Sequence, residues 1–240
     1  LVLTGIDLGS YSYVSDDGRI RLGALVRLLL DALDEAGHQD VRLRIGSIEP
    51  RSLDDEFIKV LAESDGRVCR HLHLPLQSGS DKVLKEMNRP YTSRDFADLV
   101  ARLKREVGDI SLTTDIIVGF PGEMEQDFAD TCNLAREVGF TKIHVFRYSR
   151  REGTPAAART DQVPSEVKER RAHELSALGD ALRIEYAQRH IGAEERIAVE
   201  QDGWGMTESY YKVRLRGEYA PGSLVQARLT GVDDAGIMSV

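Results

Sequence analysis

Strand-like and helix-like segments alternate along most of this chain, and no other feature constrains its fold as strongly. Short runs rich in Val, Ile and Leu are typical of buried strands, and they are separated by stretches with apolar residues at helical spacing. Strands are expected over residues 1–6, 41–50, 71–76, 110–120 and 142–149. Helices are expected over residues 22–37, 52–62, 82–87, 93–107, 123–139 and 165–190, and a polar loop over residues 7–21. Such alternation with short connections predicts an α/β fold with a parallel sheet, curled into a barrel or doubly wound.

The pattern changes near Gly192, where short β-rich segments follow one another without a helix between them. Turn sequences such as DG, PG and DDAG separate these segments. This pattern predicts a small antiparallel β-barrel or sandwich. Two domains are therefore expected, an α/β domain over residues 1–191 and a β domain over residues 192–240.

The expected strand at residues 71–76, HLHLPL, carries leucines on one face and histidines on the other. In a parallel barrel, alternate strand residues face the interior and the surrounding helices, and sites lie at the carboxyl ends of the strands. The three leucines should pack under helices, while His71, His73 and Gln77 should face the interior. Two imidazoles there favour a wet cavity for a polar ligand. A metal pair of His71 and His73 lacks a third ligand at suggestive spacing, and hydrogen-bonded interior histidines are the alternative.

The expected strand ends carry hydroxyl, amide, carboxylate or glycine groups. They are Gly5, Asp7, Ser47, Glu49, Gln77, Ser78, Asp115, Gly119, Glu123, Tyr148 and Ser149. Helix capping is the simpler explanation for some polar residues at these turns, such as Glu123 and Ser80. Asp115 differs, because it lies within the strand TTDIIVG, where burying a bare carboxylate is too costly. It must therefore have a partner or face a ligand.

Composition excludes some functions and leaves others open. The net charge is −8, with 32 basic and 40 acidic residues, and this balance argues against a broad nucleic-acid footprint. Residues 142–171 carry an excess of Lys and Arg, and they form either a solvated loop and helix start or a phosphate-contacting patch. No apolar run reaches the ~18 residues that a membrane span needs, so no membrane partner is expected.

The two cysteines, Cys69 and Cys132, lie far apart and outside any CxxC spacing. A disulfide framework is therefore not expected, and a reducing, cytoplasmic location fits best. Each is either a small buried hydrophobic residue, which is favoured, or a ligand or nucleophile. The first residues, LVLTGIDLGS, resemble neither a signal peptide nor a chain start, so upstream sequence is expected. The sequence contains no P-loop, GxGxxG or Ser-His-Asp motif, and residue patterns alone do not reach a reaction.

Several strand-end motifs, taken together and in this order, resemble the radical S-adenosylmethionine (SAM) methylthiotransferases. They are LTGIDLGSY (3–11), IGSIEP (45–50), HLHLPLQSGSDKVLKEMNRPYT (71–92), TTDIIVGFPGEMEQDF (113–128) and HVFRYSRREGTPAA (144–157). The later MTESYYKVRL (206–215) is similar to the start of a TRAM domain, a small RNA-binding β-barrel. The resemblance covers essentially the whole chain. It implies a partial radical-SAM (β/α) barrel followed by a TRAM-like β-barrel.

The family acts on adenosine 37 of tRNA or on a ribosomal protein. SIEP and HVFRYSRREGTPAA are most similar to the branch that methylthiolates N6-threonylcarbamoyladenosine at C2; the isopentenyladenosine and ribosomal-protein branches are the alternatives. The resemblance implies the tRNA anticodon loop and an electron donor as partners, and SAM and two [4Fe–4S] clusters as cofactors. The chain carries neither the three cysteines that hold one cluster nor the CxxxCxxC loop that holds the other. It therefore offers no family metal ligands, and the fragment alone is expected to be inactive.

The resemblance also implies which residues bind. Those expected to bind SAM are Gly5, Asp7, Ser47, Glu49, Gln77, Ser78, Asp115 and Gly119. Those expected to contact tRNA are Tyr148, Ser149, Arg150 and Thr154 at the last strand end, and Tyr211, Lys212 and Arg214 in the β domain. Arg147 departs from the family, which often has proline there. Catalytic residues are not assigned.

Two other hypotheses compete with this one. The chain could be a tRNA- or cofactor-binding module without catalysis, because the cluster cysteines are missing from it. It could also be an aldolase-like barrel enzyme, which would need a catalytic lysine at a strand end. Lys142 begins its strand instead of ending it, so the aldolase hypothesis ranks last.

Overall fold

The computed structural model describes residues 1–15, 18–233 and 237–240. The chain packs into two compact units. The first comprises Leu1–His73, Arg102–Ser111 and Ile184–Val240. The second comprises Leu74–Ala101 and Leu112–Arg183. The division into domains at residues 191 and 192 stays a prediction.

The α/β part contains five strands that pair in parallel. They are β1 (Val2–Leu3), β4 (Arg44–Ile45), β5 (His71–His73), β6 (Ser111–Val118) and β7 (Lys142–Arg147). Strand β1 pairs with β4, and the other three form a sheet in the order β5-β6-β7. Single parallel bridges also join Leu43 to Val68 and Ser47 to His73. The predicted parallel α/β arrangement is confirmed, although most strands are shorter than expected.

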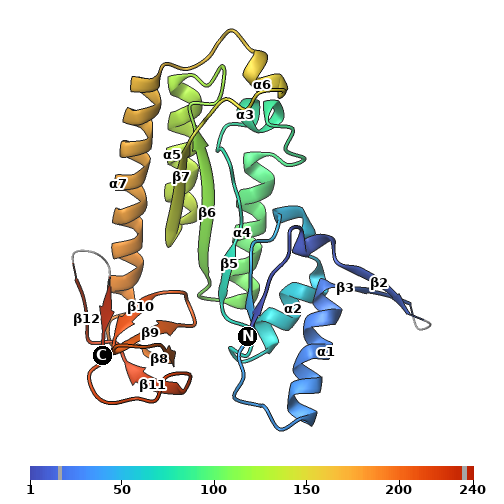
Figure 1. The fold of residues 1–240 in the computed structure, drawn as a ribbon, viewed down its shortest axis with the longest axis vertical. Coiled ribbons are helices and arrows are strands. Elements are labelled where there is room, and N and C mark those ends of the chain that lie inside the picture. The colour runs from blue at the N-terminus through green and yellow to red at the C-terminus, as the bar shows by residue number, and fades with distance from the viewer. Residues whose placement is uncertain (16–17, 234–236) are drawn as a thin grey trace. The chain divides into compact units, whose positions relative to one another are not determined.

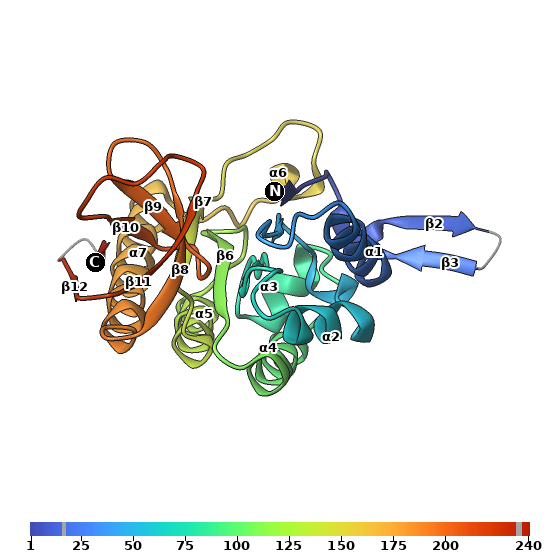
Figure 2. The same cartoon turned by 90° about the horizontal axis from the view of Figure 1, so that it is seen from below.

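The helices lie where the apolar spacing predicts them (Figure 1). They are α1 (Leu22–Glu35), α2 (Asp55–Glu63), α3 (Asp81–Glu86), α4 (Ser93–Val107), α5 (Glu125–Val138) and α7 (Ser165–Arg189), with a short additional helix α6 (Pro155–Ala158). Local capping sets several ends: the Asp54 carboxylate accepts a hydrogen bond from the Phe57 amide at 2.7 Å, and α5 ends at Gly139 in the left-handed conformation. Figures 1 and 2 show α5 beside β6 and β7, the two strands that it connects.

The polar loop predicted over residues 7–21 is wrong for most of its length. A 3₁₀ turn over Leu8–Ser10 is followed by an antiparallel hairpin, in which β2 (Ser12–Ser15) pairs with β3 (Gly18–Arg21). Gly18 has a φ of 130°, a value that favours glycine, at the start of the returning strand. The sequence did contain a signal, because short alternating segments flank an Asp-Asp-Gly turn sequence.

The C-terminal segment forms one six-stranded sheet. Its strands are β8 (Glu194–Val199), β9 (Trp204–Thr207), β10 (Lys212–Arg214), β11 (Leu224–Arg228), β12 (Gly231–Val232) and β13 (Met238–Ser239). The sheet order is β11-β8-β9-β10-β13-β12. Every pairing is antiparallel except that of β10 with β13, so the predicted antiparallel module is corrected at that pair. A TRAM-like barrel stays a prediction.

Alternation along the HLHLPL segment explains much of the core. Leu72, Leu74 and Leu76 are all fully buried, as the sequence predicts for the face that packs under helices. A separate apolar cluster lies under the C-terminal sheet and includes Ile197, Val213 and also Tyr186 from the end of α7. Within the residues that the structure describes, no helix is long and apolar enough to cross a membrane.

Shortening Leu74 to alanine should lower the free energy of unfolding by about 2–5 kcal/mol, because it removes fully buried methyl groups and leaves a cavity. Urea unfolding of the purified protein measures the change. Leu28→Ala is the matched control, because Leu28 lies on α1 with about half of its surface exposed. Equal effects of the two substitutions would contradict the assigned core.

Candidate functional site

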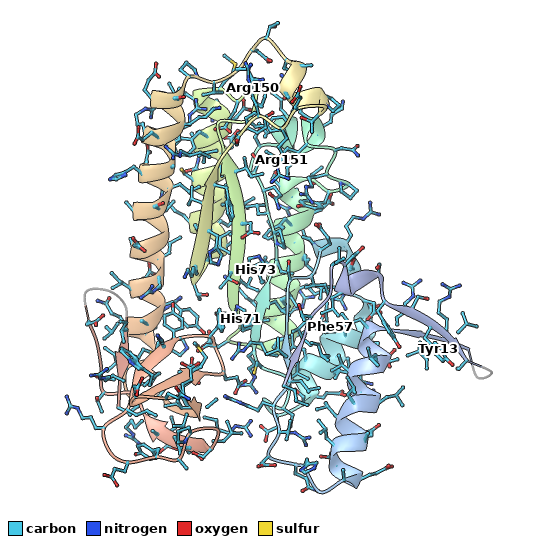
Figure 3. The ribbon with its side chains drawn as sticks, in the orientation of Figure 1. Tyr13, Phe57, His71, His73, Arg150 and Arg151 are labelled. Carbon is cyan, nitrogen blue, oxygen red and sulfur yellow. The ribbon has the colours of Figure 1, made fainter. Side chains whose placement is uncertain are left out.

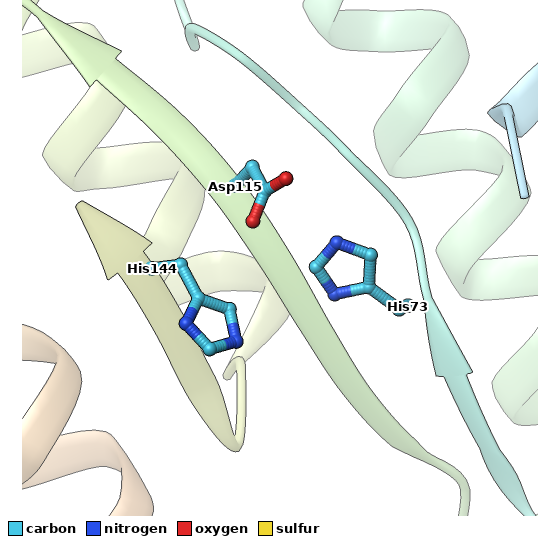
Figure 4. A group of neighbouring side chains, drawn as sticks. All are labelled: His73, Asp115 and His144. Carbon is cyan, nitrogen blue, oxygen red and sulfur yellow. The ribbon is translucent and has the colours of Figure 1, made fainter. Parts of the chain in front are cut away.

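The centre of the candidate site is a cross-strand pair on β6 and β7. Asp115 and His144 lie opposite each other in the parallel register, so their side chains emerge on the same face. Both are half-buried. His73 ends β5, and the next residue, Leu74, donates its amide to the Thr113 carbonyl of β6 at 2.9 Å. Ligand atoms of Asp115 and His144 lie within 4.8 Å of each other (Figure 4).

Asp115 and His144 together have the chemistry of part of a metal site. Imidazole nitrogens and a carboxylate oxygen are ordinary ligands for transition metals. The sequence reasoning paired His73 with His71 and found no third ligand. His144 was missed because its place beside Asp115 depends on the register of two strands, and spacing along the chain gives no signal of that register.

His71 packs beside an aromatic ring and a basic residue of its own unit. It is buried, and its ring centroid lies 4.6 Å from that of Tyr210. The Arg44 guanidinium lies over the Tyr210 ring, 4.8 Å from its centroid. Burial, with help from Arg44 and His73, lowers the pKa of His71 to about 3. It is therefore neutral at physiological pH. Figure 3 labels His71 and His73, which the sequence places on the same face of one strand.

Gln77 and Ser78 follow β5, and the structure gives them different neighbours. Gln77 has a φ of 67°; its amide donates to the Asp115 carbonyl at 2.8 Å, and its own carbonyl accepts from Ile117 at 2.9 Å. These two bonds bring Gln77 beside Asp115. The Ser78 hydroxyl instead lies 3.3 Å from the Thr131 hydroxyl of α5 and accepts from the Ser80 amide. Its polar oxygen is engaged by the turn and by α5.

Four of the residues expected to bind SAM lie in the first 50 residues and have different surroundings. They are Gly5, Asp7, Ser47 and Glu49. Ser47 is exposed and forms a parallel bridge with His73. Gly5 is also exposed. The Asp7 carboxylate accepts from the Ser10 amide at 3.2 Å, and Glu49 is the residue before a 3₁₀ turn. Asp7 therefore has a local capping role in this structure.

A tight turn follows β6, and here we call Gly119–Gly122 the β6 turn. Gly119 has a φ of 73°, and a Cβ there would lie 2.3 Å from Cγ of Lys168. Glycine at position 119 therefore leaves room for the aliphatic part of the Lys168 side chain. Glu123, which was weighed as a helix cap, instead closes this turn, because its Oε2 accepts from the amides of Gly119 at 2.8 Å and Phe120 at 3.2 Å. The α5 helix begins two residues later than expected, at Glu125.

The end of β7 carries an aromatic and basic group. The Tyr148 ring packs edge-on against Phe120, with ring centroids 5.3 Å apart, and the Lys168 ammonium lies 5.1 Å from the same ring. Burial and the neighbouring Arg150 lower the pKa of Lys168. Among the described residues, the buried Tyr148 hydroxyl has no hydrogen-bond partner. An unsatisfied buried hydroxyl is uncommon and marks this end of β7 as a place where a ligand or water would be stabilised.

The other residues expected to contact tRNA after β7 differ in availability. Ser149 and Arg150 are exposed, and Figure 3 shows Arg150 and Arg151 on the segment that leaves β7. Thr154 is engaged as the cap of α6, because its hydroxyl donates to the Arg151 carbonyl at 2.8 Å and accepts from the Ala157 amide at 3.3 Å. The exposed arginines are therefore the better candidates for contacts with phosphate.

In the C-terminal sheet, the three residues predicted to contact tRNA have different environments. Tyr211 is buried in the core and stacks on Tyr186, with ring centroids 5.3 Å apart. Lys212 and Arg214 are exposed, and their cationic groups lie 4.8 Å and 4.7 Å from the Trp204 ring centroid. Alternation along β10 explains the difference, because successive residues point to opposite faces of the sheet. Trp204, Lys212 and Arg214 form a cluster that we call the tryptophan patch.

The cysteines do not fit the iron–sulfur clusters that the resemblance implies. Cys69 and Cys132 are both buried with free thiols, as predicted for small hydrophobic residues. Burial raises the pKa of both thiols, which disfavours the thiolate form that binds iron. The chain has no other cysteines. No chemical step can therefore be assigned to a cluster held by these residues.

Comparison with known proteins accounts for this combination of fold and site. Residues 11–135 match the Radical SAM superfamily. Threonylcarbamoyladenosine tRNA methylthiotransferase MtaB of Bacillus subtilis is 41% identical over 239 residues, which are 95% of this chain and 51% of that protein. A tRNA-2-methylthio-N(6)-dimethylallyladenosine synthase of Acetivibrio thermocellus is 41% identical over 193 residues, 79% of this chain and 39% of that protein. This chain thus spans about half or less of the length of these relatives.

A solved structure supports the fold. Coproporphyrinogen III oxidase (HemN) of Escherichia coli, a radical SAM enzyme, superposes with a TM-score of 0.52 at 22% identity, covering 67% of this chain and 37% of that one. With these matches, the chain belongs to the radical SAM superfamily. Within that superfamily it is a member of the methylthiotransferase family, as its strand-end motifs predicted.

A second polar region lies in the first unit, where a cavity of about 400 Å³ is lined by Tyr186, Glu195, Glu208 and other residues. Burial, and secondarily the charge of Glu208, raises the pKa of Glu195 to about 7. The pKa of Asp109 is instead lowered, because its carboxylate is hydrogen-bonded to His190. Glu195 is therefore the acidic group here that changes its charge near neutral pH.

Glu195→Gln should stabilise the protein at pH 8 by at most about 3 kcal/mol, because it removes a buried charge. The folded-state pKa of Glu195 lies above its usual value, so the folded protein favours the protonated carboxyl group. The contribution of Glu195 to the free energy of unfolding is therefore complete below about pH 4.5 and is lost as the pH rises through 7. Urea unfolding of wild type and variant between pH 4.5 and 8 measures the difference. Glu194→Gln is the control, because Glu194 is the exposed neighbour. A wild type that gained stability relative to Glu195→Gln on raising the pH would refute this.

Proposed function

We propose that this chain is the SAM- and substrate-binding part of a tRNA methylthiotransferase that modifies C2 of N6-threonylcarbamoyladenosine at position 37. The main support is the 41% identity to a threonylcarbamoyladenosine tRNA methylthiotransferase over 95% of the chain. Dimethylallyladenosine-type relatives that match a similar share of this chain are 36% and 38% identical. A second MtaB, of Thermotoga maritima, is 35% identical over the whole chain, so the preference for the threonylcarbamoyl substrate rests on the first match and on the SIEP and HVFRYSRREGTPAA motifs. The dimethylallyl substrate is the second candidate.

The chain's own residues would bind and orient the reactants. When bound, SAM and its cluster supply the radical that activates C2 of the adenine. The Asp115 carboxylate suits an ammonium group or ribose hydroxyls, and Gln77 beside it is an uncharged hydrogen-bonding residue. His144, opposite Asp115, can hold a proton on either ring nitrogen. Three polar groups of this kind meet the needs of a zwitterionic nucleoside.

Two surfaces support the proposal that the substrate is the anticodon loop of tRNA. Arg147, Arg150 and Arg151 are exposed at and after the end of β7, where they can contact phosphates. The tryptophan patch combines an aromatic ring with two cations, which suits the stacking of unpaired bases. We further propose a cytoplasmic location, where tRNA is modified, and an electron donor as a second partner.

Reconstitution of the intact protein with iron and sulfide tests the function. The assay offers tRNA that carries either threonylcarbamoyladenosine or dimethylallyladenosine, and mass spectrometry of the nucleosides detects the methylthio product. We expect a product with the threonylcarbamoyl substrate. A product only with the dimethylallyl substrate would support the second candidate, and no product with either would overturn the proposed chemistry.

Asp115→Asn should lower the rate of methylthiolation by about 100-fold, because it removes the charge that orients the reactants. The same nucleoside assay measures the rate. Asp98→Asn is the control, because Asp98 is an exposed aspartate on α4 whose carboxylate pairs with the exposed Arg94. Similar rates for the wild type and Asp115→Asn would remove Asp115 from the site.

Trp204→Ala should weaken tRNA binding by about 1–3 kcal/mol through the loss of base stacking. Lys212→Ala should weaken tRNA binding less than Trp204→Ala. It should reduce the slope of log binding constant against log salt concentration by about 1, because about one fewer counterion is released. Filter binding at several salt concentrations measures both effects. Tyr219→Ala serves as the control, because Tyr219 is another exposed aromatic residue of the C-terminal segment. An unchanged affinity of Trp204→Ala would show that the tryptophan patch does not bind tRNA.

A further inference from the structure

The β6 turn is held by a buried ion pair. Glu123, whose carboxylate accepts from the amides of Gly119 and Phe120, also pairs with Arg171 from α7 at 2.9 Å. The side chains of the two charged residues are only 3% and 4% exposed. Burial raises the pKa of Glu123, and Arg171 and the two amides oppose that rise.

Arg171 is itself fixed from several sides. One guanidinium nitrogen donates to both the backbone carbonyl and the carboxylate of Glu123, at 3.1 and 2.9 Å. The other donates to Glu125 at 2.7 Å, and the group lies 5.6 Å from the Phe128 ring. Arg171 thus joins the β6 turn to the first turn of α5. Its neighbour Arg170 is half-exposed and pairs with the same Glu125 from the surface.

Stability alone does not account for this pair. Removing two charges from water costs several kcal/mol for each ion, and an apolar pair of similar volume is often as stable or more stable. A buried pair of charges can instead fix one geometry, as a polar group does when it sets the register of a packed interface. Here the carboxylate is bonded to two consecutive turn amides, so its position sets the conformation of the turn.

The β6 turn also sets the position of residues in the candidate site. Phe120 packs edge-on against Tyr148, whose amide donates to the Val118 carbonyl at the end of β6. The same strand carries Asp115. A turn that relaxed would therefore displace both Tyr148 and the carboxyl end of β6.

We propose that Arg171 is a positioning residue for SAM binding, which acts through Glu123 on the β6 turn. The inference rests on the proposed function, because it assumes that SAM binds at the ends of β6 and β7. Arg171 itself need not touch SAM. It holds the carboxylate whose two amide bonds keep the turn in its binding geometry.

Equilibrium dialysis of SAM against the intact, cluster-loaded protein tests this, with the melting temperature measured in parallel. Arg171→Met should raise the dissociation constant for SAM by about tenfold or more. It should also lower the melting temperature, because the Glu123 charge is left buried without its partner. Arg170→Met is the matched control, since it removes an arginine one position earlier that also contacts Glu125, and it should leave SAM affinity within about twofold.

Two more variants separate positioning from stability. The double variant Glu123→Met/Arg171→Met removes both buried charges and should regain most of the melting temperature, yet its SAM affinity should stay low because the turn amides have lost their acceptor. Arg171→Lys keeps a buried charge near Glu123 and should bind SAM better than Arg171→Met. For each variant, both the dissociation constant for SAM and the melting temperature are measured.

Three results would overturn the inference. The first is wild-type SAM affinity in Arg171→Met, and the second is recovery of affinity in the double variant. The third is Arg171→Lys binding no better than Arg171→Met. If the wild type itself does not bind SAM, the proposed function fails and this inference fails with it, whereas normal binding by the wild type confines a negative result to Arg171.

Discussion

The parallel pairing of β6 with β7 is the interaction on which the candidate site depends. It sets six consecutive residues opposite one another, from Thr113 and Lys142 to Val118 and Arg147. Asp115 meets His144 only in that register, and a slip of one residue would send one of the two side chains to the other face. The same hydrogen-bond ladder continues into Tyr148, whose amide bonds to Val118. A polar site thus follows from backbone pairing.

Charged and polar groups in this region are stabilised by neighbours, as burial requires. Glu123 is neutralised by Arg171 and bonded by two amides, and the fully buried Thr114 hydroxyl donates to the Leu74 carbonyl at 2.7 Å. Ser80 in turn donates to Asp127 at 2.7 Å. Each of these buried polar groups therefore has a hydrogen-bond or ionic partner, as the low dielectric of the interior requires.

Much of the fold was predictable from the sequence, whereas the site was predictable only in part. Apolar spacing and capping residues are local signals, and they located the six main helices and the buried leucines of HLHLPL. The strand-end motifs included Asp115 and Gln77, which lie beside each other, and they also included Ser78, which bonds to α5, and Asp7, which caps a local turn. Local polarity at a turn does not show whether a side chain faces a ligand or closes the turn.

The sequence by itself determined the alternation of the main strands and helices, apart from the β2–β3 hairpin, together with the burial of the two cysteines and the membership of the family. Only the tertiary structure decided that His144 joins Asp115, that Tyr211 belongs to the core while Lys212 faces outward, and that Arg171 reaches the β6 turn. The physical reason is that helix spacing and motifs depend on neighbours along the chain. Strand register, the face on which a residue lies and long-range ion pairs depend on contacts between segments far apart in the sequence.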